Sequence, residues 1–267
     1  MSVVVFMKFC SLASGSSGNC QYIEYKDTKI IIDAGLSGKK IEENLKKIGV
    51  NPSDLDAVFV THEHIDHIKG VGVLSRRHNL KVFSNMMTLD AMLPTVKKLD
   101  PKNTFIFENG KGFTFKDLEI MPISTFHDCA SGCGFVIKGN KKLSLMTDTG
   151  WVNQEAMEKM DGSDLIYLES NHDVDMLING TYPYPTKQRI LSTKGHLSNE
   201  NAGEVLAMIL KKKQEQVVLG HLSTDNNLPD LALRTINDLL ASEHKKENTD
   251  YTIDVAPRSD PSRVFEL

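Results

Sequence analysis

The sequence predicts an α/β protein in which stacked β-sheets are flanked by helices. Short apolar runs of strand type crowd both halves of the chain, and amphipathic helices lie between them. The 267 residues contain no internal repeat, low-complexity tract or Pro/Gly-rich linker, so we expect one domain over residues 1–267. Hydrophobic residues make up 40% of the chain and charged residues 25%, which is enough apolar material to form a real core.

The amino-terminal half is predicted to be rich in strands. The apolar run 3–9 is the first candidate, and a Gly/Ser-rich loop over residues 13–19 separates it from the next strands. Ser37 is expected to cap a helix whose apolar residues recur at helical spacing and which Gly49 ends. The strands predicted after the loop cover residues 22–25, 29–32, 57–60, 81–83, 104–107, 118–124, 135–137 and 143–146.

The carboxy-terminal half is predicted to alternate helices with strands. A helix is expected over residues 156–160, and a longer one begins at Ser198 or Asn199, with apolar residues on one face and lysines at its end. A third helix is expected over residues 228–240. The strands predicted in this half cover residues 165–168, 216–219 and 251–255.

Composition excludes several classes of protein. Thirty-one basic and 35 acidic residues give a net charge of −4, which argues against coating nucleic acid by bulk charge but leaves room for a local positive site. The apolar first decade is too short to span a bilayer and lacks the features of a signal peptide, so we expect a soluble protein with no membrane partner. Four cysteines are too few for a disulfide scaffold of this length, which favours a reducing, cytoplasmic setting.

The strongest local signal is the segment T-H-E-H-I-D-H at residues 61–67, directly after the apolar strand 57–60. Neutral imidazoles and a carboxylate are ligands that zinc and similar divalent ions prefer. A tight loop at a strand end can aim alternate side chains in different directions. His62 and His64 can then bind one metal, while Asp66 and His67 bind a neighbour. A merely His-rich surface loop is the competing interpretation, and four clustered ligand types argue against it.

Four more polar residues stand at the ends of predicted strands: Asp33, His127, Asp148 and His221. Binding sites are often built from loops at the ends of rigid strands. Taken singly, each residue fits a turn or capping position as well as a ligand position. Together they supply enough donors for two metal ions.

In this order, these residues and the T-H-E-H-I-D-H segment resemble the motifs of the metallo-β-lactamase superfamily over most of the chain. The resemblance implies an αβ/βα sandwich, two mixed sheets flanked by helices, with two divalent ions between the sheets. Zinc is the expected metal, with manganese and iron as alternatives. The H-x-H pattern departs from the H-x-E pattern of the di-iron oxidoreductase branch and favours hydrolysis. The resemblance assigns His62, His64 and His127 to the first ion, Asp66, His67 and His221 to the second, Asp148 to both, and Asp33 to orienting the histidine loop.

Further motifs are similar to the bacterial YycJ-like (WalJ) subgroup: the S-L-A-S-G-S-S-G-N loop at 11–19, L-E-S-N-H-D at 168–173, G-H-L-S-N at 195–199 and G-H-L-S at 220–223. That subgroup is associated with 5′→3′ exonuclease activity on DNA. Only 73 residues separate Asp148 from His221, which is too short for the extra domain that larger nuclease relatives insert there. The resemblance therefore implies a compact phosphodiesterase whose substrate is DNA, with RNA as an alternative.

The expected chemistry is attack on a phosphodiester by a hydroxide that bridges the two ions, with Asp66 and Asp148 among the catalytic residues. His196 is the candidate proton donor to the expelled sugar oxygen, because it lies at a predicted helix start that can also face phosphate. A loop imidazole that caps a carbonyl is an equally weighted interpretation of His196. His172 and Ser198 are the candidate substrate contacts, although a structural hydrogen bond is the simpler role for His172.

Two other functions compete with the exonuclease hypothesis. The same metal site serves hydrolases of small esters, thioesters and lactams, which do not need the region around His172 and His196 in this form. A non-catalytic, metal-stabilised binding protein is the third interpretation, and the full ligand set argues against it. The sequence alone leaves the oligomeric state open.

Overall fold

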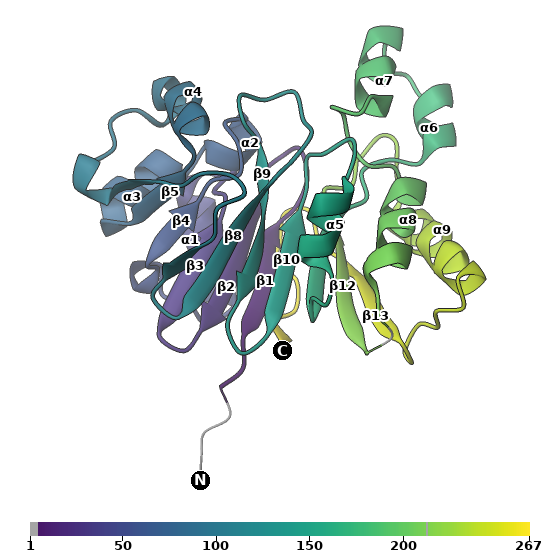
Figure 1. Ribbon diagram of the computed structural model, residues 1–267. Coiled ribbons are helices and arrows are strands. Elements are labelled where there is room, and N and C mark those ends of the chain that lie inside the picture. Colours follow the sequence, from purple (N-terminus) through teal and green to yellow (C-terminus); the bar gives the residue numbers. More distant parts are fainter. Residues whose placement is uncertain (1–4, 212) are drawn as a thin grey trace.

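The computed structural model describes residues 5–211 and 213–267. Two seven-stranded sheets pack face to face, and helices cover the outer face of each (Figure 1). The predicted αβ/βα sandwich of two mixed sheets is therefore confirmed. In the described residues, no helix combines the length and the apolar character needed to cross a membrane.

The first sheet is formed mainly by the amino-terminal half of the chain. Its antiparallel part joins the first three strands, and its parallel part extends from the third strand to the sixth. The carboxyl ends of β1, β3, β4, β5 and β6 therefore lie at one edge. The strand order is β14 (Phe265–Glu266), β1 (Lys8–Ala13), β2 (Cys20–Tyr25), β3 (Thr28–Ile32), β4 (Ala57–Phe59), β5 (Lys81–Ser84) and β6 (Thr104–Ile106).

The second sheet repeats this plan with the remaining strands. Its last four strands run parallel, while β8, β9 and β10 are paired antiparallel. The carboxyl ends of β8, β10, β11, β12 and β13 therefore share one edge. The strand order is β13 (Tyr251–Val255), β12 (Glu215–Gly220), β11 (Leu165–Glu169), β10 (Lys142–Met146), β9 (Cys133–Lys138), β8 (Leu118–Ser124) and β7 (Phe113–Phe115).

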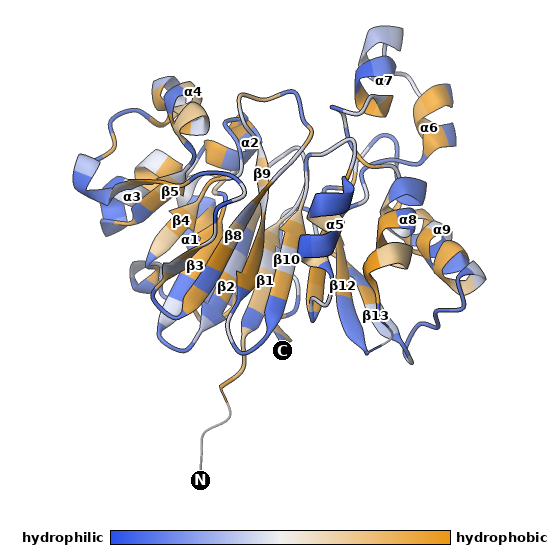
Figure 2. Ribbon diagram, in the orientation of Figure 1, coloured by the Kyte–Doolittle hydropathy of each residue, from blue (hydrophilic) through white to orange (hydrophobic). Residues whose placement is uncertain are grey.

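The main core lies between the two sheets, and alternation along the strands explains it. Ile30 and Ile32 of β3 face the opposite sheet, whereas Ile31 faces the helices outside. In β11, Tyr167 points inward and Ile166 outward. Both faces of each sheet are thus buried by apolar side chains, and Figure 2 shows orange segments along the strands of both sheets.

Helices cover the outer faces by amphipathic packing. Ser37 caps the first helix, its Oγ accepting a hydrogen bond from Lys40 N at 3.3 Å, and Ser198 caps the eighth in the same way with Asn201 N at 3.1 Å. The first sheet is covered by α1 (Gly38–Lys47), α2 (Ile65–Ile68), α3 (Val71–His78) and α4 (Met86–Val96). The second is covered by α5 (Gln154–Met160), α8 (Asn199–Ile209) and α9 (Pro229–Ser242).

Some sequence-based expectations need correction. The strand predicted over residues 3–9 begins at Lys8 and continues to Ala13, because pairing with β2 starts at Lys8 and Val5 and Phe6 are exposed; residues 3–4 lie outside the described part. Several short elements were not predicted at all. They are α2, α3, α4, α6 (Val174–Asn179), α7 (Tyr184–Leu191), β7, β14 and two 3₁₀ turns, Pro52–Asp54 and Pro101–Asn103.

Candidate metal centre

The site lies where the carboxyl ends of the two sheets meet. Asp33 directly follows β3, and His221 directly follows β12. Asp148 stands two residues beyond β10. All three adopt the left-handed backbone conformation, with φ of 60°, 57° and 54° respectively, which is uncommon outside glycine and turns each side chain sharply out of its strand.

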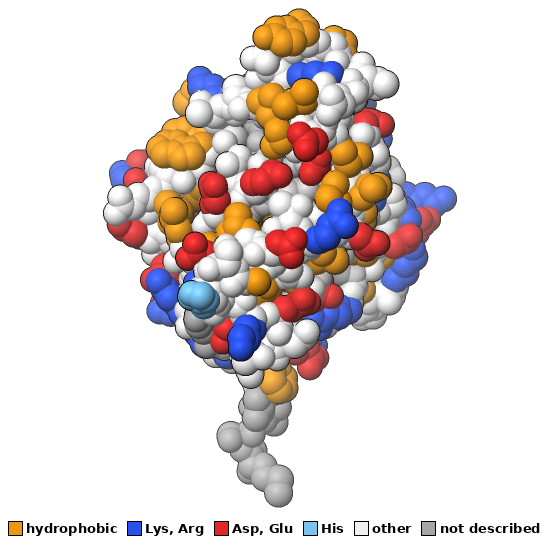
Figure 3. Space-filling model, turned by 90° about the vertical axis from the view of Figure 1, so that its right-hand side faces the viewer, with side chains coloured by type: hydrophobic (Ala, Val, Ile, Leu, Met, Phe, Trp, Pro, Cys, Tyr) orange, Lys and Arg blue, Asp and Glu red, His pale blue; other side chains and the backbone are white. Residues whose placement is uncertain are grey.

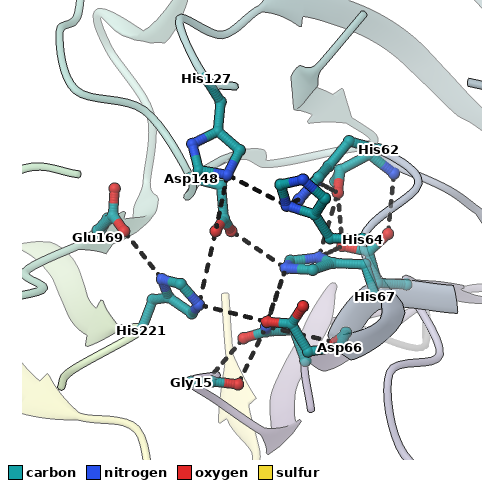
Figure 4. A network of polar contacts seen from close by, with 12 residues as sticks. Gly15, His62, His64, Asp66, His67, His127, Asp148, Glu169 and His221 are labelled. Carbon is teal, nitrogen blue, oxygen red and sulfur yellow. Dashed lines mark hydrogen bonds and ion pairs between the residues drawn. The ribbon is translucent and has the colours of Figure 1, made fainter. Parts of the chain in front are cut away.

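Three histidines form the first candidate ligand group. His64 Nδ1 lies 3.1 Å from His62 Nε2 and 3.3 Å from His127 Nε2. Figure 4 shows these ring nitrogens directed toward one another. Burial lowers the pKa of His62 well below its usual value and also lowers that of His127, so both rings are neutral at pH 7 and keep a lone pair free.

Asp66, His67 and His221 form the second group. Asp66 Oδ2 lies 3.7 Å from His67 Nε2 and 3.8 Å from His221 Nε2. Burial alone would lower the pKa of both histidines, but the Asp148 carboxylate, helped by other nearby carboxylates, raises that of His67 well above its usual value and that of His221 to about 10. The nearby carboxylates therefore create a strongly negative electrostatic potential at this group.

Asp148 lies between the two groups (Figure 4). Its carboxylate oxygens are 3.2 Å from His67 Nε2, 3.6 Å from His221 Nε2 and 3.9 Å from His127 Nε2. Burial alone would raise the pKa of this carboxyl, but the charges of His221 and His67 hold it well below its usual range.

The donor set fits a pair of divalent ions. Imidazole nitrogens and carboxylate oxygens are arranged in compact groups whose ligand atoms lie within 4.8 Å of one another. Two buried atoms in these groups, Asp148 Oδ2 and His221 Nε2, make no hydrogen bond among the described residues, and their ion-pair contacts are with other members of the same groups. Buried ligand atoms that contact only one another are well placed to bind a cation.

Asp33 supports the histidine loop from behind. Its Oδ2 lies 2.6 Å from His67 Nδ1 and accepts a hydrogen bond from Thr61 Oγ1 at 2.8 Å. Its Oδ1 accepts from Thr61 N, also at 2.8 Å. These contacts leave His67 Nε2 directed at the centre, in the arrangement by which a carboxylate orients a ligating histidine.

Sequence reasoning missed Glu169, which is completely buried at the end of β11. Its Oε1 lies 2.7 Å from His196 Nδ1 and 2.9 Å from His221 Nδ1. Burial alone would raise the pKa of the Glu169 carboxyl, but the neighbouring His196 and His221 lower it to about 2. Its position could have marked it as a site residue, because Glu169 lies at the end of a predicted strand, at the same sheet edge as Asp148 and His221.

Asn19 is the other residue that was missed. It belongs to the Gly/Ser-rich loop, and its Nδ2 lies 3.0 Å from His67 Nε2 and 3.4 Å from Asp66 Oδ2. Its Oδ1 accepts a hydrogen bond from Gly15 N at 2.8 Å, which ties the loop to the second group. In the sequence this asparagine was indistinguishable from an ordinary turn residue.

The three candidates outside the metal motifs lie in different surroundings. His196 reaches the centre: its ring centroid is 5.0 Å from that of His127 and 5.3 Å from that of His221. Ser198 is buried in the cap of α8. His172 is also buried, neither ring nitrogen has a hydrogen-bond partner among the described residues, and burial lowers its pKa to about 4.

Comparisons with known proteins show the family to which the chain belongs. The family model described as a beta-lactamase superfamily domain matches residues 28–222. The chain is 41% identical to exodeoxyribonuclease WalJ of Streptococcus pneumoniae, over 96% of this chain and 97% of that protein. It is 40% identical to exodeoxyribonuclease YycJ of Bacillus anthracis, over 88% of this chain and 89% of that protein.

A solved structure supports the fold. The metallo-beta-lactamase fold protein YhfI from Bacillus subtilis superposes with a TM-score of 0.73 at 18% identity, covering 98% of this chain and 100% of that one. The fold family implies divalent metal ions, and the described residues contain the ligand groups to hold them. The chain belongs to the beta-lactamase superfamily, with the metallo-β-lactamase fold and close relatives among the WalJ and YycJ exodeoxyribonucleases.

Proposed function

We propose that this protein is a binuclear metal-dependent phosphodiesterase that degrades DNA as a 5′→3′ exonuclease. The observation that carries the proposal is the pair of ligand groups that share Asp148. The similarity to two exodeoxyribonucleases over most of the chain supports DNA as the substrate.

Seven residues would hold the metal ions. Zinc is the expected ion, and manganese and iron are the alternatives. When bound, two such ions activate water at neutral pH and neutralise phosphodiester charge. The first ion would be held by His62, His64 and His127, and the second by Asp66, His67 and His221. Asp148 would contribute to both, because its oxygens lie 3.2 Å from His67 Nε2, 3.6 Å from His221 Nε2 and 3.9 Å from His127 Nε2.

The protein's own residues orient the ligands and handle the proton. Asp33 fixes the ring of His67, and Glu169 fixes that of His221. Glu169 also contacts His196 Nδ1, which directs His196 Nε2 away from the carboxylate. His196 would then donate its proton to the sugar oxygen that leaves the phosphorus.

The charge of the molecule agrees with a local rather than a general phosphate site. The net charge is −4, and on the side that carries α8 and α9 acidic and basic side chains are interspersed (Figure 3). Attraction of DNA would therefore depend on the metal ions and a few residues around them.

A nuclease assay tests the proposal. Single- and double-stranded DNA and RNA, labelled at the 5′ or the 3′ end, are incubated with the protein and Mn²⁺ or Zn²⁺. We expect stepwise, metal-dependent release of nucleotides from the 5′ end of DNA, and no release by an Asp148→Ala variant. Turnover of a small ester or thioester without cleavage of any nucleic acid would refute the proposed substrate.

A further inference from the structure

Arg258 lies at the rim of the metal centre without an acidic partner. It follows β13 by three residues, and because β13 runs parallel to β12, it emerges at the same sheet edge as His221. Its Nη2 donates a hydrogen bond to the Leu222 carbonyl, one residue beyond His221, at 3.3 Å. Among the described residues, no carboxylate lies within 4.0 Å of this guanidinium.

The guanidinium rests on the Gly/Ser-rich loop between β1 and β2. Gly15 has a φ of +117°, and a Cβ there would stand 3.2 Å from Arg258 Nη1, so glycine permits this close approach. Arg258 Nη1 donates to Ser17 Oγ at 3.3 Å. Ser16 and Ser17 are exposed, and neither backbone amide donates to an acceptor among the described residues.

A cavity of about 380 Å³ adjoins this cluster. Its lining includes Ser14, Leu222, Ser223 and Arg258. Ser14 Oγ accepts a hydrogen bond from His221 N at 2.7 Å, so the wall of the cavity is joined directly to the second ligand group. Gly15 N donates to Asn19 Oδ1, and Asn19 Nδ2 lies 3.4 Å from Asp66 Oδ2, so the loop adjoins the second ligand group.

We propose that Arg258 and the serine-rich loop 14–18 bind the 5′-terminal phosphate of a DNA strand. A planar guanidinium with nearby free amides and hydroxyls matches the oxygens of a phosphomonoester. A terminal monoester carries up to two negative charges at neutral pH, one more than an internal diester, so an unpaired arginine favours the end of the strand. The inference rests on the proposed exonuclease activity and names the group by which that activity selects the 5′ end.

A kinetic test compares two oligonucleotides that differ only in their 5′ group. We expect wild-type protein to release the first nucleotide from 5′-phosphorylated single-stranded DNA with a kcat/KM about 10- to 100-fold higher than from the 5′-hydroxyl form. Arg258→Gln should abolish this preference by slowing the phosphorylated substrate alone, and Arg258→Lys should restore part of it. Arg234→Gln, which removes a charge from an exposed position of α9, is the matched control and should keep the full preference.

A binding test separates this inference from the proposed activity. With a chelator present, where no hydrolysis occurs, the anisotropy of 3′-labelled trinucleotides reports their affinity. Wild-type protein should bind the 5′-phosphorylated form more tightly, and Arg258→Gln should bind both forms equally. Thermal unfolding of each variant confirms that the fold is intact.

The outcomes are distinct. If DNA is degraded from its 5′ end at the same rate with either 5′ group, the phosphate site is refuted while the exonuclease survives. If Arg258→Gln slows both substrates equally, the arginine binds an internal phosphate and the inference is overturned. If no DNA is cleaved but the binding preference disappears in Arg258→Gln, the phosphate site survives and the exonuclease proposal fails.

Discussion

The two ligand groups of the metal centre are built from similar side chains but supported very differently. In the second group, His67 is backed by Asp33, and His221 by Glu169. In the first group, His127 Nδ1 lies 3.1 Å from a backbone carbonyl, that of Gly195. Carboxylates thus raise the pKa values of His67 and His221 in the second group, whereas burial lowers those of His62 and His127 in the first.

This difference shows that one fold can give two adjacent metal sites different degrees of support for their ligands. In the second group, Asp33 and Glu169 fix the orientation of the histidine rings, and the carboxylates create a negative electrostatic potential. We therefore expect this group to bind its ion tightly. Within the described part of the chain, the first group has no carboxylate behind its histidines comparable to Asp33 or Glu169, and His64 is partly exposed at the start of α2. We therefore expect the first ion to bind more weakly and to exchange more readily.

The largest effect is expected from Asp148→Asn, which removes the charge shared by the two groups. Loss of several kcal/mol of electrostatic stabilisation should lower nuclease activity by about a thousandfold and reduce the bound metal below two ions per chain. Elemental analysis after desalting measures the metal content. Asp90→Asn, an exposed position on α4, should retain both activity and metal. Full metal content in Asp148→Asn would contradict a shared ligand.

A smaller effect should distinguish the two supporting carboxylates. Glu169→Gln should lower kcat by about 10- to 100-fold even at saturating metal, because Glu169 contacts the proposed proton donor His196 as well as His221. Asp33→Asn should instead weaken binding of the second ion and recover most activity when metal is added. Steady-state kinetics over a metal titration separate the two, and identical behaviour would remove Glu169 from proton transfer.

The smallest effect is the release of protons on metal binding. His221, with a pKa of about 10, is protonated at pH 7, and the pKa of His67 is also raised well above its usual value, so an ion in the second group must displace the protons of both rings. Affinity at that group should therefore rise as the pH increases from 7 towards 10. His62 is already neutral, so binding at the first group should be nearly independent of pH over this range.

Calorimetry in buffers of different ionisation enthalpy measures this release. A His64→Ala variant, which leaves only the second group intact, should retain the proton release. If the release disappears in that variant, the contrast between the two groups is assigned the wrong way round.

The sequence predicted the elements that the site depends on because they obey strong local rules. Apolar strands followed at once by Asp33, Asp148 or His221 located the sheet edge, since parallel strands end on the same side. The strands β3, β4, β8, β10, β11 and β12 and the helices α1, α5, α8 and α9 were predicted with small shifts at their ends.

The missed features depend on tertiary contacts. Glu169 resembles any residue at the end of a strand until its oxygens are seen between two histidines. Arg258 belongs to a polar stretch without periodicity. Its position beside the metal centre becomes visible only through its contacts with the 13–19 loop. Within α4, Pro94 obscured the helical pattern, and β14 is too short to have a pattern of its own.

The pairing of β14 with β1 has a consequence for the order of folding. The two strands come from opposite ends of the described chain, and Phe265 packs on Phe9 with ring centroids 6.0 Å apart. The ribosome synthesises β1 first and β14 last among the described strands, so the first sheet gains this edge strand only after residues 265–266 have emerged. The segment from β13 to β14 also carries Arg258. All proposed metal ligands, the last of which is His221, are therefore synthesised before Arg258, and selection of DNA ends would be acquired after the metal site.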